Sequence, residues 1–261
     1  MHGRLKRTMA VGILLVVSAS GCDSQPRPAT TSITVFASSS MITSLTAIGK
    51  QFQAENPGTS VEFIFASSSE LSARLLDGAD VDVFVSGDQD HMSAVGKAGL
   101  LQGAPVPLAS NSLVIATAAD NHDKLATFAD LARSDVRTAV CGGQGACASA
   151  TRQVEDLTGV QLHPQEIDST ASDVLKDVTS GKVDAGVVFT TDAMSVGDNV
   201  SWFAFPGAAD AAVTSWIASM KDSDQAALAT KFVQDATGAA GRKVFTDAGF
   251  DEHLEAGHHI Q

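Results

Sequence analysis

Short apolar stretches alternate along the chain with stretches in which apolar residues recur every three or four positions. The first kind of stretch predicts buried strands. The predicted strands are residues 33–36, 61–65, 81–85, 113–116, 138–140 and 183–189. The second kind predicts helices, and the clearest case places Met41, Leu45, Ile48 and Phe52 on one face of a helix that ends at Asn56.

This alternation continues to the C-terminal part of the chain. Further helices are predicted around residues 71–75, 92–95 and 174–178 and over residues 225–234 and 239–248. Strands that alternate with helices form sheets through strand–crossover–strand units, which predicts an α/β fold. Ligands of such folds bind beyond the carboxyl ends of the parallel strands.

Two serine runs, residues 38–40 and 67–69, follow predicted strands and open predicted helices. The first turn of a helix has backbone N–H groups without an intrahelical partner, and the helix dipole favours anions there. Serine hydroxyls add donors, and their small size lets an anion approach the backbone. Together with residues 86–90, the runs predict an oxyanion site at one sheet edge. Each run taken alone is more typical of an ordinary helix cap.

The N-terminal residues have the pattern of a secretory signal. Basic residues precede an apolar run over residues 9–17, which is too short to span a membrane. A cysteine directly after small residues resembles the lipobox of bacterial lipoproteins, although Ala19 replaces the usual leucine. We therefore expect a signal peptide over residues 1–21, a lipid anchor at Cys22 and a tether over residues 22–32. A plain cleaved signal is the alternative.

Charge and cysteine content narrow the choice of partners. The formal net charge is −13, and loss of residues 1–21 with their three basic residues moves it to −16. This acidity argues against a nucleic-acid partner. Cys141 and Cys147 are expected to form a disulfide in the oxidising compartment that a secretory signal implies. A metal site would need further Cys or His ligands nearby, which this segment lacks.

Five motifs occur in the order and spacing of one known family. They are TVFASSS from Thr34, FASSS from Phe65, DVFVSGDQ from Asp82, NSLV from Asn111 and GVVFTTDA from Gly186. With these motifs the chain resembles the molybdate-binding proteins of ABC importers over nearly all of its length after the signal. The resemblance implies a two-lobed α/β fold of the periplasmic-binding-protein type (type II), with the ligand in the cleft between the lobes.

The resemblance also implies where the lobes divide. Lobe 1 is expected to comprise residues 33–108 plus 214–261, and lobe 2 residues 109–213. The two connections between them are expected near residues 108–112 and 211–215. Closure about such hinges buries a ligand between the lobes.

The family's ligand-binding positions carry over one by one. Its serine positions in the first lobe fall on Ser40 and Ser68, with Ser69 adjacent. Two positions in the second lobe that bind through backbone N–H groups fall on Ala148 and Val174.

The chain departs from the family at a position where a tyrosine hydroxyl often binds the ligand. Phe189 occupies that position, and the chain has no tyrosine. Ser149, Ser172 and Thr190 are the candidate replacement donors. Cys147 replaces a common family proline, so the disulfide loop is expected to shape the adjacent helix start.

The N-terminal pattern and the family resemblance together imply a lipid-anchored extracytoplasmic receptor, and the resemblance alone implies that it is monomeric. It would capture molybdate or tungstate for the permease of an ABC importer, with no cofactor, no direct protein–metal ligands and no catalysis. In a site made of donors, the proton of hydrogen phosphate would lack an acceptor at a cost of about 1–3 kcal/mol, unless Asp88 or another carboxylate reaches the pocket. Sulfate carries no proton at neutral pH, so discrimination against it would have to come from the size of the cavity, because molybdate and tungstate are larger. Asp88 and Asp192 are expected to cap helices.

Two alternatives stay open. One is a receptor for another oxyanion such as sulfate, thiosulfate or phosphate. The other is a serine hydrolase with His91 or His122 as the base, although the chain has no Gly-x-Ser-x-Gly elbow, phosphate loop or His-Glu-x-x-His motif. Receptors for ferric ions or sugars are disfavoured, because tyrosine is absent and only 5% of the residues are aromatic.

Overall fold

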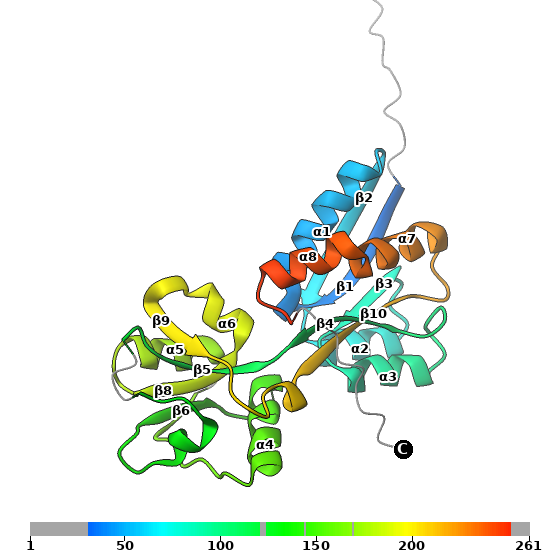
Figure 1. The fold of residues 1–261 in the computed structure, drawn as a ribbon. Coiled ribbons are helices and arrows are strands. Elements are labelled where there is room, and N and C mark those ends of the chain that lie inside the picture. Colours follow the sequence, from blue (N-terminus) through cyan, green and yellow to red (C-terminus); the bar gives the residue numbers. More distant parts are fainter. Residues whose placement is uncertain (1–30, 121–123, 144, 169, 252–261) are drawn as a thin grey trace, which may run out of the picture.

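Two five-stranded sheets, each covered by helices, make up the protein (Figure 1). The computed structural model describes residues 31–120, 124–143, 145–168 and 170–251. The predicted signal peptide, the predicted anchor Cys22 and His122 lie outside the described residues. Among the described helices, none combines the length and the apolar character needed to cross a membrane.

Strands and helices alternate along the chain as the sequence pattern predicts. The strands are β1 (Thr31–Ser38), β2 (Thr59–Ala66), β3 (Val83–Ser86), β4 (Val106–Asn111), β5 (Leu113–Ala118), β6 (Thr138–Cys141), β7 (Glu166–Asp168), β8 (Ala185–Phe189), β9 (Val200–Phe203) and β10 (Val213–Ser219). The α-helices are α1 (Ile42–Glu55), α2 (Ser68–Leu76), α3 (Gln89–Lys97), α4 (Ala146–Thr158), α5 (Ala171–Thr179), α6 (Thr190–Ser195), α7 (Ala226–Thr237) and α8 (Ala239–Asp247). Short 3-10 turns are η1 (Ser39–Met41), η2 (Phe128–Ala132), η3 (Gly197–Asn199) and η4 (Ala209–Ala211).

The first sheet has the strand order β2-β1-β3-β10-β4. β1 pairs in parallel with β2 and β3, whereas β10 runs antiparallel to β3 and β4. Helices α1, α7 and α8 cover one face, and α2 and α3 cover the other (Figure 1). Because successive side chains of a strand point to opposite faces, Val35 packs with Leu45 of α1, and its neighbour Phe36 packs with Leu71 of α2. The three parallel strands therefore end at one edge, where each turns into a helix.

The second sheet has the strand order β7-β6-β8-β5-β9. β6 pairs in parallel with β7 and β8, and β5 runs antiparallel to β8 and β9. One face buries Val154 of α4 together with Phe128 of η2, and the other buries Val174 and Leu175 of α5. Each sheet thus has its own core on both faces.

Two chain segments cross between the sheets, one from β4 to β5 and the other from β9 to β10 (Figure 1). Ser112 joins β4 of the first sheet to β5 of the second, and the chain returns between β9 and β10. The described C-terminal end reaches the same place, because the backbone N–H of Asp251 donates to the carbonyl of Ser110 (2.8 Å) and the Ser112 hydroxyl donates to the Asp251 carboxylate (3.0 Å). The backbone N–H of Thr190, the first residue of α6 after β8, donates to the Ser112 carbonyl (3.0 Å).

The α/β fold class predicted from the pattern is confirmed. Every predicted strand is present within two residues of its predicted ends, and the predicted helices correspond to α1, α2, α3, α5, α7 and α8. The pattern missed β4, β7, β9, β10, α4 and α6. β1 begins at Thr31, so Thr31 and Ser32, assigned to the tether by composition, form the first residues of a strand.

Candidate functional site

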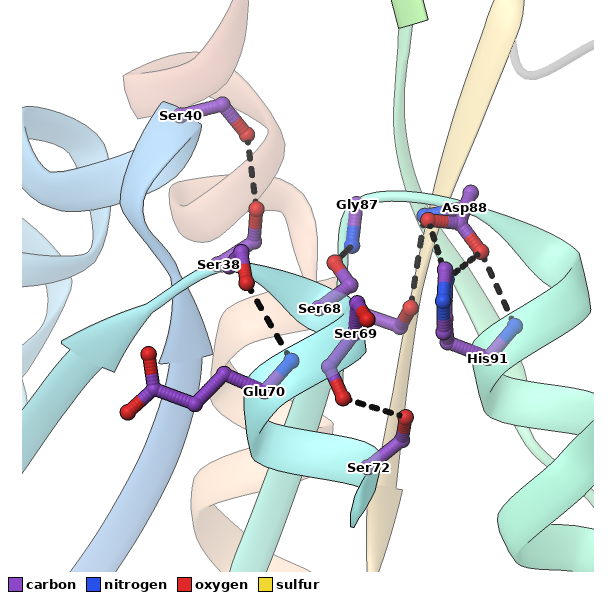
Figure 2. Close-up of polar contacts among 11 residues, drawn as sticks. Ser38, Ser40, Ser68, Ser69, Glu70, Ser72, Gly87, Asp88 and His91 are labelled. Carbon is purple, nitrogen blue, oxygen red and sulfur yellow. Dashed lines mark hydrogen bonds and ion pairs between the residues drawn. The ribbon is translucent and has the colours of Figure 1, made fainter. Parts of the chain in front are cut away.

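The carboxyl ends of β1, β2 and β3 bring a cluster of small polar groups together (Figure 2). The Ser68 hydroxyl oxygen accepts the backbone N–H of Gly87 at 2.9 Å, and the hydroxyls of Ser38 and Ser40 lie 3.0 Å apart. A side-chain carbon added at Gly87 would lie 2.8 Å from the Ser38 hydroxyl oxygen and 3.4 Å from that of Ser68. The three strand ends therefore meet at a point where only glycine fits.

The three serines of the second run make different contacts. Ser67 caps α2, because its hydroxyl accepts the backbone N–H of Glu70 (3.1 Å), which is the ordinary role that the sequence allowed. Ser68 is buried and faces the first serine run (Figure 2). Since its oxygen accepts from Gly87, its hydroxyl proton is available for another acceptor. Ser69 is exposed, and its carbonyl accepts the hydroxyl of Ser72 (3.1 Å).

Asp88 caps α3, as predicted, by accepting the backbone N–H of His91 at 2.9 Å. The same carboxylate lies 2.8 Å from the ring Nδ1 of His91. This local pair lies along the first turn of α3 (Figure 2). A carboxylate on Nδ1 also orients the base of a hydrolase, but neither Asp88 nor His91 is among the residues that line the cavity between the two sheets.

A cavity of about 120 Å³ lies between the two sheets. Residues from both sides and from the crossings line it: Ser40, Gly87, Asn111, Ala146, Phe189, Thr191, Asp192, Val213, Ser215 and Phe250. Hydroxyl and amide side chains are prominent in this lining. Among these described residues none is Lys, Arg or His.

Three helix starts that reach the cavity, those of η1, α4 and α6, carry no side-chain cap on their N-cap residue, but at α6 the N–H of Thr190 already donates to the Ser112 carbonyl. Ser40 lies in η1, which continues into α1, and the position before η1 makes no capping hydrogen bond. Ala146 opens α4 after Gly145, which has no side chain to cap it. By contrast, α2, α3 and α5 each have a side-chain cap. The first N–H groups of η1 and α4 are therefore available to a ligand in the cavity, whereas the N–H of Ile42, which opens α1, already donates to the Ser39 carbonyl.

The disulfide predicted from the sequence joins Cys141 at the end of β6 to Cys147 in the first turn of α4. Ala148 follows directly and is the third residue of α4, with its side chain buried. Its N–H belongs to the first turn, where helix geometry provides no intrahelical acceptor. The disulfide thus fixes the helix start that contributes Ala146 to the cavity.

Val174 does not match the donor role expected of it. Its backbone N–H donates to the carbonyl of Thr170 (3.2 Å), and its side chain is fully buried in the core. The physical reason is that α5 begins at Ala171, capped by Thr170, so Val174 already belongs to the hydrogen-bonded part of the helix. Ser172 lies in the first turn but lines a separate surface groove with Lys176 and Asn199.

The structure also separates the candidates for the missing tyrosine hydroxyl. Phe189 lines the cavity and precedes α6. The Thr190 hydroxyl donates to the Ser112 carbonyl (3.1 Å), and the Ser149 hydroxyl accepts from the guanidinium of Arg152 (3.1 Å). The hydroxyl that does line the cavity from this side belongs to Thr191, which the sequence reasoning missed although it lies inside the GVVFTTDA motif.

Asp192 places a carboxyl group in the cavity lining. Burial raises its pKa, and a hydrogen bond from the backbone N–H of Phe189 partly opposes the rise. Asp192 was expected to cap the helix that follows it, but α6 begins at Thr190 with Phe189 as its N-cap, so the carboxylate reaches back from within the first turn. The lining is therefore not purely a set of donors.

A second acidic cluster lies away from this cavity. Glu166, Asp168 and Asp177 could in principle converge on a metal ion. Lys182 Nζ, however, lies 3.0 Å from Glu166 and 2.7 Å from Asp177, and these contacts raise the pKa of Lys182. The ammonium group already provides the positive charge that the cluster needs.

Comparisons with known proteins agree with this arrangement. The chain is 43% identical over 251 residues to the molybdate-binding protein ModA of Mycobacterium tuberculosis, which covers 93% of this chain and 96% of that protein. It is 26% identical over 168 residues to the putative ABC transporter substrate-binding lipoprotein YvgL of Bacillus subtilis, with 62% and 64% covered. The substrate binding domain of a putative molybdenum ABC transporter from Clostridium difficile shares the fold, with a TM-score of 0.72 at 20% identity over 86% of this chain and 100% of that one.

These comparisons confirm the resemblance that the five motifs indicated, and with it the two-lobed α/β fold. The match to the family model for bacterial extracellular solute-binding proteins spans residues 33–251, which includes both sheets and the cavity between them. The chain belongs to the family of bacterial extracellular solute-binding proteins.

Proposed function

We propose that this protein is the substrate-binding component of an ABC importer and that it captures molybdate, with tungstate as a second ligand. The observation that carries the proposal is the cavity between the sheets, whose described lining offers hydroxyls and uncapped helix starts but no cationic side chain. Helix N-termini and hydroxyl donors suffice to bind an oxyanion. The printed name of the M. tuberculosis relative, a molybdate-binding protein, supports the choice of ligand.

The proposed first-lobe donors are Ser40 and Ser68, with Ser69 adjacent. Ser40 lines the cavity, and Ser68 holds Gly87, which also lines it. From the second lobe, the proposed donors are backbone N–H groups of the first turn of α4, up to Ala148. All of these groups are neutral dipoles, so the ligand charge is met by oriented donors and not by a counter-ion.

The lobes are proposed to be residues 33–108 plus 214–261 and residues 109–213, hinged near residues 108–112 and 211–215. The crossings near Ser112 and before β10 support this division, because they join two otherwise separate sheets. Since β4 extends to Asn111 within the first sheet, residues 109–111 are counted here with the first lobe, and the first boundary moves from residue 108 to Ser112. Closure about them would surround the ligand with donors from both lobes.

Hydrogen phosphate is a second candidate ligand, and Asp192 is the observation that favours it. A site of donors alone would leave the proton of hydrogen phosphate without an acceptor. The Asp192 carboxylate lines the cavity and can accept such a proton. Unprotonated molybdate, tungstate and sulfate gain nothing from that carboxylate.

The proposal also covers where the protein resides in the cell. A signal peptide over residues 1–21 and a lipid anchor at Cys22 would hold the receptor outside the cytoplasm, and the description of the B. subtilis relative as a lipoprotein supports the anchor. The partner would be the membrane permease of the importer, met by a monomeric receptor without a cofactor or an enzymatic activity of its own.

Isothermal titration of the purified protein with molybdate, tungstate, sulfate and phosphate tests this proposal. We expect molybdate and tungstate to bind tightly and sulfate weakly. Ser40→Ala and Ser68→Ala should each weaken molybdate binding by about tenfold or more, because a hydrogen bond to a charged group is worth about 1.5–3 kcal/mol. Ser180→Ala, at an exposed serine outside the cavity lining, is the matched control.

Each result separates the candidates. Tight phosphate binding with weak molybdate binding would keep the site and change the ligand. Absence of heat with all four oxyanions would contradict the proposal as a whole. Tight binding that neither serine substitution weakens would place the ligand elsewhere.

A further inference from the structure

The second lobe needs a side-chain donor if the ligand is to be held from both sides, and Phe189 provides none. The three hydroxyls that the sequence offered are engaged or misplaced. Thr190 donates to the Ser112 carbonyl, Ser149 is exposed and is not among the residues that line the cavity, and Ser172 lines a different groove. Among the described residues that line the cavity, Thr191 is the one from the second lobe that carries a hydroxyl.

Thr191 is paired across the lobes. Its hydroxyl oxygen accepts the side-chain N–H of Asn111 at 2.9 Å, and Asn111 is the last residue of β4 in the first sheet. Both residues line the cavity, and both are half-buried. The contact therefore joins the two lobes at the cavity wall, next to the crossing at Ser112.

Two polar groups of the pair have no hydrogen-bond partner in it: the hydroxyl hydrogen of Thr191 and the side-chain carbonyl oxygen of Asn111. A hydroxyl that accepts one hydrogen bond keeps its own proton for another acceptor. The side-chain carbonyl oxygen of Asn111 is buried and has no hydrogen-bond partner within the described part of the chain. If the amide were turned over, Thr191 would donate to that oxygen and the amide N–H₂ would be left free. In either orientation the pair keeps at least one polar hydrogen for a ligand.

We propose that Thr191 and Asn111 together supply the second-lobe side-chain donor to the oxyanion, in place of the absent tyrosine hydroxyl. Thr191 contacts the ligand, and Asn111 orients it. The inference rests on the proposed oxyanion-binding function. It assigns specificity to a pair that spans both lobes, so the donor is fully placed only when the lobes hold their relative position.

Titration calorimetry of Thr191→Val tests the assignment, because valine keeps the shape of threonine and removes the hydroxyl. We expect molybdate affinity to fall by about ten- to a hundredfold, which corresponds to one hydrogen bond to a charged ligand. Thr191→Ser should stay within about threefold of the wild type, since it retains the hydroxyl. Thr230→Val, at an exposed threonine of α7 whose hydroxyl donates to the Ala226 carbonyl, is the control and should bind like the wild type.

Two further variants make the test specific. Adding Phe189→Tyr to Thr191→Val should recover part of the affinity by restoring a hydroxyl at the neighbouring position. Thr190→Val tests the rival donor, and the inference predicts that it affects the affinity less than Thr191→Val does. Thermal unfolding of each variant shows whether the fold is intact, and Thr191→Ala replaces Thr191→Val if the latter fails to fold.

The outcomes distinguish this inference from the function on which it rests. If Thr191→Val binds molybdate as tightly as the wild type does, the assignment of Thr191 is overturned and the proposed function is unaffected. The assignment is likewise overturned if Thr190→Val lowers the molybdate affinity more than Thr191→Val does. A wild-type protein that binds no oxyanion overturns both.

Discussion

Gly87 shows how little space the proposed site leaves at a single residue. A side-chain carbon there would lie 2.8 Å from the Ser38 hydroxyl oxygen, closer than such carbons approach other atoms. Ser38 is buried and lies 3.0 Å from Ser40, so it cannot move without disturbing the cavity wall. The glycine is required by this close approach and not by an unusual backbone angle.

Gly87→Ala should therefore weaken oxyanion binding by about tenfold or more, because it displaces the hydroxyls of Ser38 and Ser68. Calorimetric titration measures the loss. Gly96→Ala in α3 is the matched control, since its added carbon would lie at an ordinary 3.4 Å from Leu101 and alanine favours a helix. Equal affinities of the two variants would show that the cluster at Gly87 does not contribute to binding.

Asp192 is the residue whose charge opposes the proposed ligand. Burial raises its pKa, so the folded state holds the proton more tightly than the unfolded state. Its ionised form therefore destabilises the fold above the folded-state pKa, and this effect disappears as the pH falls below the unfolded-state pKa. The same ionised carboxylate repels a dianion in the cavity.

Asp192→Asn keeps an oxygen to accept the Phe189 N–H and removes the charge. At pH 8 we expect tighter molybdate binding, by roughly tenfold or more, and a higher unfolding midpoint. Both differences from the wild type should shrink as the pH falls through the folded-state pKa of Asp192. Titrations and thermal scans at several pH values measure them. Weaker phosphate binding by Asp192→Asn, with molybdate binding unchanged, would instead favour hydrogen phosphate as the ligand.

At the scale of elements, the sequence predicted the helices and strands whose buried residues are apolar and closely spaced along the chain. β1, β5 and β8 are runs of buried apolar residues, and their positions follow from the pattern. The hydrophobic pattern missed α4, whose start only the resemblance implied, because its buried face is made largely of small residues such as Ala148 and Ala150, which give a weak periodic signal. β4 was missed because it ends in polar residues that lie near the cavity.

The candidate site was predictable to the same extent. The two serine runs follow from strand ends, which the pattern locates well, whereas the choice of Ser40 and Ser68 within them rests on the family resemblance and stays a prediction. The N–H of Val174, expected as a donor, is already bonded to Thr170, because a shift of three residues at a helix start decides whether an N–H is free, and the cap at Thr170 was not recognised. The pairing of Asn111 with Thr191 depends on how two lobes meet, which no local pattern encodes.

The disulfide at the start of α4 gives a prediction about an element. Its sulfurs join residues separated by six positions. The chain-entropy model assigns about 2 kcal/mol to so short a loop. The double variant Cys141→Ala/Cys147→Ala should therefore unfold at a lower temperature, by about 4–8 °C, and bind molybdate more weakly because the first turn of α4 loses its tie to β6.

Reduction of the wild type offers the control for that variant. Alkylation followed by mass spectrometry reports whether the bond is formed in the purified protein. Reduced wild type and double variant should then show the same unfolding midpoint and the same affinity. A double variant as stable and as tight in binding as the oxidised wild type would contradict the role given to the bond.

The whole molecule carries a charge of the same sign as its proposed ligand. The formal net charge is −13, whereas the described cavity lining contains no cationic side chain. Attraction therefore acts only at contact, through oriented N–H and O–H groups, and repulsion acts at longer range. The two contributions respond differently to salt, because screening affects charges separated by more than a Debye length.

Raising the ionic strength from about 0.01 M to about 0.15 M shortens the Debye length from about 30 Å to about 8 Å. The rate constant for molybdate association should then rise several-fold, because long-range repulsion is screened, while the dissociation rate constant, set by contact donors, should change little. Affinity would increase with salt, opposite to the behaviour of a site built from Lys and Arg.

Stopped-flow fluorescence can follow the reaction through Trp216, the neighbour of the cavity residue Ser215. Repeating the series with two salts that have different anions shows whether the salt anion itself competes. An affinity that falls steadily as the ionic strength rises would mean that cationic groups take part in binding, and the account of a site made of neutral donors would have to be abandoned.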